Sequence, residues 1–253
     1  MNFSTFKNKR IFLTGHTGFK GSWLAVWLRR LGAEVYGYSL PPPTDPSNYA
    51  LSRVHDLMHD ETLADIRDRK TLRETMAAFK PDVVFHLAAQ PLVRDSYAMP
   101  YETFEVNVMG TASVLDAVRA TGRPCAVVCI TTDKCYENRE QVWGYRECDP
   151  MGGHDPYSAS KGAAELLISS YRRSFFAPAR LAAHGVQLAS ARAGNVIGGG
   201  DWAKDRIVTD MVAALAAGCP VPVRNPLAIR PWQHVLEPLS GYLTLAAAML
   251  EQP

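Results

Sequence analysis

The sequence contains no apolar run close to the ~20 residues that a membrane-spanning helix needs. Its opening stretch, "MNFSTFKNKRIFLTG", also lacks the long apolar region and the small-residue cleavage site of a secretory signal. From these two absences we expect no membrane partner and a cytoplasmic location.

An excess of charge is also missing, because 27 basic side chains are balanced by 25 acidic ones and the formal net charge is +2. Such a balance gives no electrostatic basis for binding nucleic acid or an anionic membrane. We therefore expect no nucleic-acid partner, and any anion must be bound by a local cluster of cations.

Cysteine is scarce, and its spacing is not that of a metal site. The five cysteines form no CxxC pair, and their odd number does not suit a disulfide framework. Reduced thiols in a cytoplasmic protein are the simplest interpretation, and no metal ligands are predicted.

What the chain does contain is an alternation of apolar, strand-like segments with segments of helical spacing. The predicted strands are 10–15, 34–39, 61–66, 82–89, 125–132 and 186–194, and the predicted helices are 21–33, 69–80, 100–121, 156–176 and 205–217. This order predicts an α/β fold with a doubly wound, parallel Rossmann-type sheet. Ligands of such sheets bind at the carboxyl ends of the strands.

A glycine-rich stretch, "LTGHTGFKGSW", lies between the first strand and the first helix. Glycines three residues apart allow a backbone without Cβ atoms to approach a pyrophosphate at the positive end of a helix. The residues assigned to this cofactor loop are Gly15, Thr17, Gly18, Phe19 and Gly21. A tight turn that binds nothing is the alternative interpretation.

The second strand ends at Tyr38 and Ser39, without the carboxylate that commonly holds the ribose 2′-hydroxyl of NAD. The Ser39 hydroxyl can bond either a ribose hydroxyl or a 2′-phosphate. No arginine follows closely, so NAD is the expected cofactor and NADP remains open.

Two stretches carry ionisable groups where ligands are expected to bind. In "ITTDKCYEN" a buried strand ends at Thr132, followed by Asp133 and Lys134. In "YSASK", Tyr157 and Lys161 lie four residues apart on one helix face. A nearby ammonium favours a phenolate and so lowers a tyrosine pKa, which suits removal of an alcohol proton. The alternatives are a solvated ion pair and an exposed helical tyrosine and lysine.

With "TGHTGFKGSW", "FHLAAQ", "TTDKCY" and "YSASK" in this order, the whole chain resembles the extended short-chain dehydrogenase/reductases that act on nucleotide sugars, the NAD-dependent epimerase/dehydratase family. Two further stretches, "AGNVIGGGDW" and "RNPLAIRPWQHV", resemble its 4,6-dehydratase branch. The resemblance implies a nucleotide-sugar substrate, bound NAD and a homodimer formed by the helices over 100–121 and 156–176.

The resemblance also implies catalytic roles. Tyr157, with Thr132 and Lys161, takes the proton of the sugar 4-hydroxyl while hydride leaves C4. Elimination of water across C5–C6 then needs an acid and a base, for which Asp133 and Lys134 are the candidates. Related dehydratases have a carboxylate in place of Lys134, so its other possible role is electrostatic stabilisation of the enolate.

Further binding residues follow from matching motifs. The cofactor residues are Asp65, Ile66, Leu87, Ala88 and Ala89, and the substrate residues are Asn195, Asp201, Trp202, Arg206, Arg224 and Arg230. Strand core is the alternative for the former group, and surface ion pairs or core packing for the latter. His16, His86 and His234 are expected to have no catalytic role.

The chain divides, on this interpretation, into a dinucleotide-binding domain over 1–194 and part of a smaller substrate-binding region over 195–253. The second region is rich in proline and looks shortened at its C-terminal end. Two alternatives to a dehydratase stay open: another epimerase or reductase of the family, and a non-catalytic protein that binds dinucleotide and senses redox state.

Overall fold

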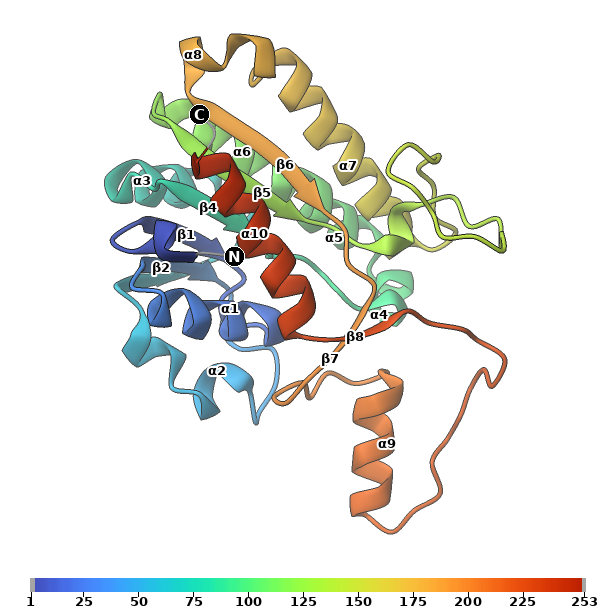
Figure 1. The fold of residues 1–253 in the computed structure, drawn as a ribbon. Coiled ribbons are helices and arrows are strands. Elements are labelled where there is room, and N and C mark those ends of the chain that lie inside the picture. Colours follow the sequence, from blue (N-terminus) through green and yellow to red (C-terminus); the bar gives the residue numbers. More distant parts are fainter. Residues whose placement is uncertain (1–2, 252–253) are drawn as a thin grey trace.

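A six-stranded parallel sheet forms the centre of the computed structural model, which describes residues 3–251 (Figure 1). The strands are β1 (Arg10–Thr14), β2 (Glu34–Ser39), β3 (Asp60–Leu63), β4 (Val83–His86), β5 (Cys125–Ile130) and β6 (Val186–Ala191). Their order is β3-β2-β1-β4-β5-β6, and every neighbouring pair is parallel. The predicted doubly wound Rossmann-type sheet is therefore confirmed, with its switch of direction between β1 and β4.

The central strands are apolar on both faces because helices cover both faces. Every residue of β4 and β5 is buried. Alternate residues of β1 serve the two sides: Ile11 and Leu13 belong to one core cluster, and Phe12 belongs to the other. This division follows from the two-residue repeat of a strand.

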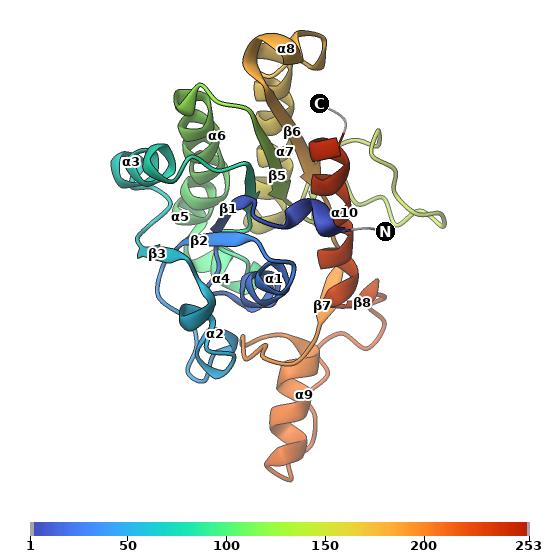
Figure 2. The same cartoon turned by 60° about the vertical axis from the view of Figure 1, so that its left-hand side comes forward.

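Five long helices make these two layers. They are α1 (Phe19–Arg30), α3 (Arg69–Phe79), α6 (Gly110–Thr121), α7 (Pro156–Ser174) and α10 (Leu236–Glu251). Helices α1 and α10 pack on one face of the sheet, and α3, α6 and α7 pack on the other (Figures 1 and 2). The predicted helix 100–121 is α5 (Pro100–Phe104), a π-helical turn (Glu105–Met109) and α6 in succession.

Shorter elements join these layers: α2 (Asn48–Leu51), α4 (Val93–Ala98), α8 (Leu181–His184) and single 3-10 turns. Within residues 3–251, no helix has both the length and the hydropathy required to cross a bilayer.

The region after residue 194 differs from its prediction in one respect. The strands β7 (Asn195–Ile197) and β8 (Trp232–His234) form a separate parallel pair, and α9 (Ile207–Ala216) extends away from the body with no buried residue (Figure 2). By contrast, α10 places Leu239 and Leu243 in the core beside β1 and β5. Residues 236–251 therefore share the core of residues 1–194, because the apolar face of α10 fills that face of the sheet. Substrate binding by residues 195–235 stays a prediction.

Candidate active site

The glycine loop makes a tight turn between β1 and α1 that only glycine can form at two of its positions. Gly15 has φ +77°, and a Cβ there would lie 2.7 Å from the Ala88 nitrogen. A Cβ on Gly21 would lie 2.0 Å from the Gly15 carbonyl oxygen. Gly18 precedes the first residue of α1 and has only one neighbour near its missing Cβ, at 3.4 Å. The loop is therefore closely packed against the residues that follow β4, whereas its backbone at Gly18 is open. This arrangement suits a pyrophosphate at the start of α1.

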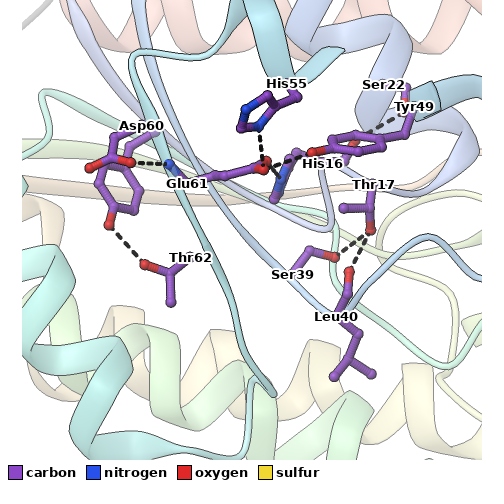
Figure 3. A network of polar contacts seen from close by, with 11 residues as sticks. His16, Thr17, Ser22, Ser39, Leu40, Tyr49, His55, Asp60, Glu61 and Thr62 are labelled. Atoms are coloured by element: carbon purple, nitrogen blue, oxygen red, sulfur yellow. Dashed lines mark hydrogen bonds and ion pairs between the residues drawn. The ribbon is translucent and has the colours of Figure 1, made fainter. Parts of the chain in front are cut away.

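Hydroxyl groups occupy the end of β2, where a carboxylate commonly stands. Thr17 Oγ1 donates to the Leu40 carbonyl at 2.8 Å and lies 2.8 Å from Ser39 Oγ (Figure 3). Since the single hydroxyl hydrogen of Thr17 is used in this way, Ser39 donates to Thr17. The contacts of both residues are with neutral oxygens.

His16 lies within the loop, but its ring points into the protein, under β2 (Figure 3). A Cβ on Gly37 would lie 2.7 Å from this ring, so the histidine needs that glycine. Its Nε2 is 2.7 Å from a Glu61 oxygen, and Glu61 also bonds the Tyr49 hydroxyl at 2.7 Å and His55 at 2.8 Å. Burial opposes ionisation of Glu61, but these three bonds hold the pKa of the carboxyl below its usual value.

Thr132, Tyr157 and Lys161 meet at the carboxyl edge of β5. Thr132 follows this strand directly and is buried. The Thr132 side chain acts on the Tyr157 hydroxyl and favours its ionised form. Lys161, one helical turn further along α7, donates from Nζ to the Ile130 carbonyl at 3.3 Å.

The pKa values of the tyrosine and lysine differ from the sequence-based expectation. Burial, followed by the charge of Asp133, outweighs the effect of the Thr132 side chain and raises the pKa of Tyr157 to about 12. Burial also lowers the pKa of Lys161 to about 8. The expected lowering of the phenol pKa is wrong for this structure, because the Lys161 ammonium bonds a carbonyl on β5 and the phenol is desolvated.

Asp133 and Lys134 lie beside this group, each with about a third of its side chain exposed. Thr132 Oγ1 donates to Asp133 Oδ1 at 3.0 Å. The Lys134 ammonium is 3.5 Å from the same Asp133 oxygen and donates to Asn195 Oδ1 at 3.3 Å. The predicted substrate residue Asn195 is therefore part of the same cluster.

The predicted arginines separate into two groups. Arg206 is ion-paired with Asp201 at 2.6 Å, and its charge acts on Tyr157 and lowers that pKa. Arg224 and Arg230 are exposed instead: Arg224 pairs with Asp205 at 2.8 Å, and Arg230 donates to the Ile229 carbonyl at 2.7 Å. The structure brings Arg206 into the site and leaves Arg224 and Arg230 exposed on the surface.

Trp202 follows Asp201 and keeps 37% of its surface exposed, so it is not a core residue in this structure.

The predicted cofactor wall follows β4. The Leu87 and Ala88 amides both donate to Thr14 Oγ1 at 3.1 Å, and Ala89 is partly exposed at the same edge. His86 is buried between two threonine hydroxyls, and burial lowers its pKa to about 3, which favours the neutral imidazole.

Asp65 and Ile66 follow β3, the outermost strand of that side of the sheet. The Asp65 carboxylate bonds Arg67 at 2.7 Å, which holds its pKa low, and Ile66 is buried against Gly110.

The sequence interpretation did not identify three residues of the site, namely Lys20, Tyr242 and Glu165. Lys20 Nζ donates to the Tyr242 hydroxyl at 3.4 Å, across 222 residues of chain. Glu165 accepts hydrogen bonds from Thr131, from Ser190 at 2.9 Å and from Arg192 at 2.9 Å, and so ties α7 to β5 and β6. Glu165 could have been identified from the sequence, since it lies four residues after Lys161 on the same helix face. No motif near Tyr242 in the sequence indicates that it belongs to the site.

Comparison with known proteins gives concordant results. The family model described as GDP-mannose 4,6 dehydratase matches residues 12–252. The CDP-glucose 4,6-dehydratase of Salmonella typhimurium is 60% identical over 240 residues, which are 95% of this chain and 67% of that protein.

Solved structures share the fold. The dTDP-glucose 4,6-dehydratase from Streptomyces venezuelae with NAD and TYD bound superposes with a TM-score of 0.81 at 24% identity, over 94% of this chain and 72% of that one. MoeE5 in complex with UDP-glucose and NAD gives a TM-score of 0.78 at 25% identity, over 96% of this chain and 73% of that one.

Proposed function

The chain belongs to the GDP-mannose 4,6-dehydratase family, and from this premise we propose that it dehydrates a nucleotide-activated glucose to the 4-keto-6-deoxy sugar, with CDP-glucose as the favoured substrate. The observation that carries the proposal is the meeting of Tyr157 with Thr132 at the edge of β5, beside Asp133. An epimerase or reductase of this fold needs the tyrosine and lysine but no acid–base pair for losing water.

NAD is the cofactor that fits the glycine loop. When bound, NAD would supply an acceptor for the hydride of sugar C4 and, once reduced, a hydride donor for C6, so the overall reaction would be a dehydration. The missing Cβ atom of Gly18, which has only one neighbour within 4 Å, leaves backbone open to a pyrophosphate at the start of α1. The neutral contacts of Ser39 and Thr17 favour ribose hydroxyls over a 2′-phosphate, which would require a cation.

Tyr157 is the group that receives the proton of the 4-hydroxyl. Thr132 acts on the phenol and is placed to bond the same sugar hydroxyl. A phenol whose pKa is about 12 becomes a useful base only when positive charge approaches it, and Arg206 already acts in that direction. Lys161 lies one turn further along α7, where its ammonium bonds the Ile130 carbonyl.

Asp133 and Lys134 complete the elimination. Asp133 gives a proton to the departing 6-hydroxyl, and Lys134 as a free amine takes the C5 proton. In the alternative role Lys134 stays an ammonium and stabilises the enolate, and the Asp133 carboxylate takes the C5 proton and passes it to the departing 6-hydroxyl, which leaves as water. The second role agrees better with the geometry, because the Lys134 ammonium lies between a carboxylate and an amide oxygen. Asn195, Asp201, Trp202 and Arg206 would contact the sugar diphosphate; the surface positions of Arg224 and Arg230 make these two weaker candidates.

The proposal includes a cytoplasmic homodimer. Large apolar side chains are exposed along α4–α7, namely Tyr97, Met99, Tyr101, Phe104, Met109 and Leu166. Leu115, although it lies on the predicted dimer helix 100–121, is buried in the core and cannot be part of this surface. A monomeric mass in equilibrium sedimentation at micromolar concentration would contradict the dimer. The free cysteines, three of them buried, support a reducing compartment.

The decisive experiment is incubation of the purified protein with NAD and CDP-glucose deuterated at C4. We expect a 4-keto-6-deoxy product, detected by its absorbance in alkali, with the deuterium at C6. Tyr157→Phe should abolish the reaction, and Lys134→Ala at full rate would remove Lys134 from the mechanism. Formation of a sugar epimer without loss of water would refute the dehydratase, and parallel assays with UDP- and dTDP-glucose test the base preference.

A further inference from the structure

Lys20 is a buried cation that the mechanism above does not use. It is the second residue of α1, directly after the glycine loop. Its ammonium donates to the Tyr242 hydroxyl at 3.4 Å and lies 5.8 Å from the centre of the Tyr242 ring. The residue as a whole keeps partial exposure, and burial is the largest cause of the lowering of its pKa.

The charges that face Lys20 come from three other parts of the chain. Lys161 on α7 and Arg206 before α9 repel it, and Asp133 after β5 attracts it. Burial and the two cations lower the pKa of Lys20 to about 8. Within residues 3–251 no carboxylate lies within ion-pair distance of its ammonium, and its one hydrogen-bond partner there is the neutral phenol of Tyr242.

A buried ammonium without an anionic partner is costly, so such a group is expected to meet an anion in the working protein. The site has four cations, Lys20, Lys134, Lys161 and Arg206, whereas its carboxylates are Asp133 and Asp201. Asp201 is already paired with Arg206, and Asp133 with Lys134. A diphosphate carries about two negative charges and would correct this imbalance. The start of α1 favours the same ligand through its exposed amides and helix dipole.

We infer that Lys20, positioned by Tyr242, binds a diphosphate group beside the glycine loop. The inference rests on the proposed function, which supplies two diphosphates, one in the dinucleotide and one in the nucleotide sugar. Tyr242 comes from α10 and also lines, with Asp133, a cavity of about 890 Å³ between β6, α7 and α10. The Tyr242 hydroxyl accepts a hydrogen bond from the Lys20 ammonium, while Leu239 and Ala246 of the same helix are packed in the core.

The test is calorimetric titration of the wild-type chain and of Lys20→Met with NAD alone and, separately, with CDP alone. A charge-assisted hydrogen bond contributes enough that the variant should bind the ligand held by Lys20 roughly tenfold more weakly or worse. A loss confined to NAD assigns the ammonium to the dinucleotide, and a loss confined to CDP assigns it to the sugar nucleotide. Unchanged affinity for both would overturn the inference.

Lys20→Arg provides a matched control with a pH readout. The lysine binds an anion only when protonated, so the wild-type affinity is complete below its pKa of about 8 and falls as the pH rises above it. The arginine stays charged and should show a shallower decline between pH 8 and 10. Lys161 titrates in the same range in both proteins, and the difference between them therefore reports Lys20.

The remaining outcomes are also decisive. Identical pH profiles of wild type and Lys20→Arg would contradict the inference even if Lys20→Met failed to fold. Tyr242→Phe should retain the charge and bind within a few-fold of wild type, with its pH decline shifted because the hydrogen bond to the ammonium is lost. A wild-type chain that binds neither NAD nor CDP would instead refute the proposed function.

Discussion

At the scale of single residues, backbone contacts decide which glycines of the loop are replaceable. Gly21 has the Gly15 carbonyl oxygen 2.0 Å from its missing Cβ, and backbone cannot yield as a side chain does. Gly199 lies in a turn with no heavy atom within 4 Å of the corresponding position. The two glycines therefore form a matched pair for testing the loop.

We predict that Gly21→Ala lowers the free energy of unfolding by about 1–3 kcal/mol through overpacking and reduces NAD affinity at least tenfold. Gly199→Ala should change neither quantity appreciably. Denaturant unfolding and calorimetry with NAD measure both. Wild-type NAD affinity in Gly21→Ala would show that the close packing of the loop is unnecessary for binding.

At the scale of elements, α7 carries the catalytic tyrosine and lysine, and its first turn is fixed by a side chain. Asp155 accepts a hydrogen bond from the Ser158 amide at 2.9 Å and another from the Ser158 hydroxyl at 2.6 Å. Pro156 occupies the first helical position, where its missing N–H costs nothing. Tyr157 follows at once, so the cap sets the direction from which the phenol reaches Thr132.

Asp155→Ala should lower the free energy of unfolding by about 1 kcal/mol, because the amides at the start of α7 lose their acceptor. Asp155→Asn keeps a capping oxygen and should lose much less. Chemical denaturation measures the difference, and turnover should fall further in the alanine variant than in the asparagine variant. Equal stability of the two variants would mean that Pro156 alone fixes the start of the helix.

At the scale of the whole molecule, the core extends past the predicted domain boundary. Leu243 of α10 is fully buried beside the sheet, whereas Leu215 of α9 is 64% exposed. The C-terminal helix therefore belongs to the Rossmann layer, and β7, α9 and β8 form the part that extends from it (Figure 1).

Leu243→Ala should accordingly lower the free energy of unfolding by about 2–5 kcal/mol, as large-to-small core substitutions do. Leu215→Ala should change it by no more than about 0.5 kcal/mol, the range of surface substitutions. Thermal or denaturant unfolding of the two variants tests the assignment. Similar losses in both would require α9 to be as well packed as α10.

Much of the fold and part of the site could be predicted because their causes are local. An apolar run such as residues 125–130 specifies a buried strand. Gly15, Gly18 and Gly21 specify a turn without side chains at these positions, directly before a helix. Tyr157 and Lys161 share a helix face because of the helical repeat, and Thr132 reaches the same edge because a parallel sheet aligns its strand ends.

The tertiary structure decided what depends on distant neighbours. Burial, rather than the cation four residues away, sets the pKa of Tyr157, and no local pattern gives that desolvation. The partner of Lys20 is 222 residues further along the chain, on a helix whose place against the sheet depends on the whole core. Periodicity and motif record which groups are present and which face they share; only packing determines how far each group lies from water and from the opposing charges.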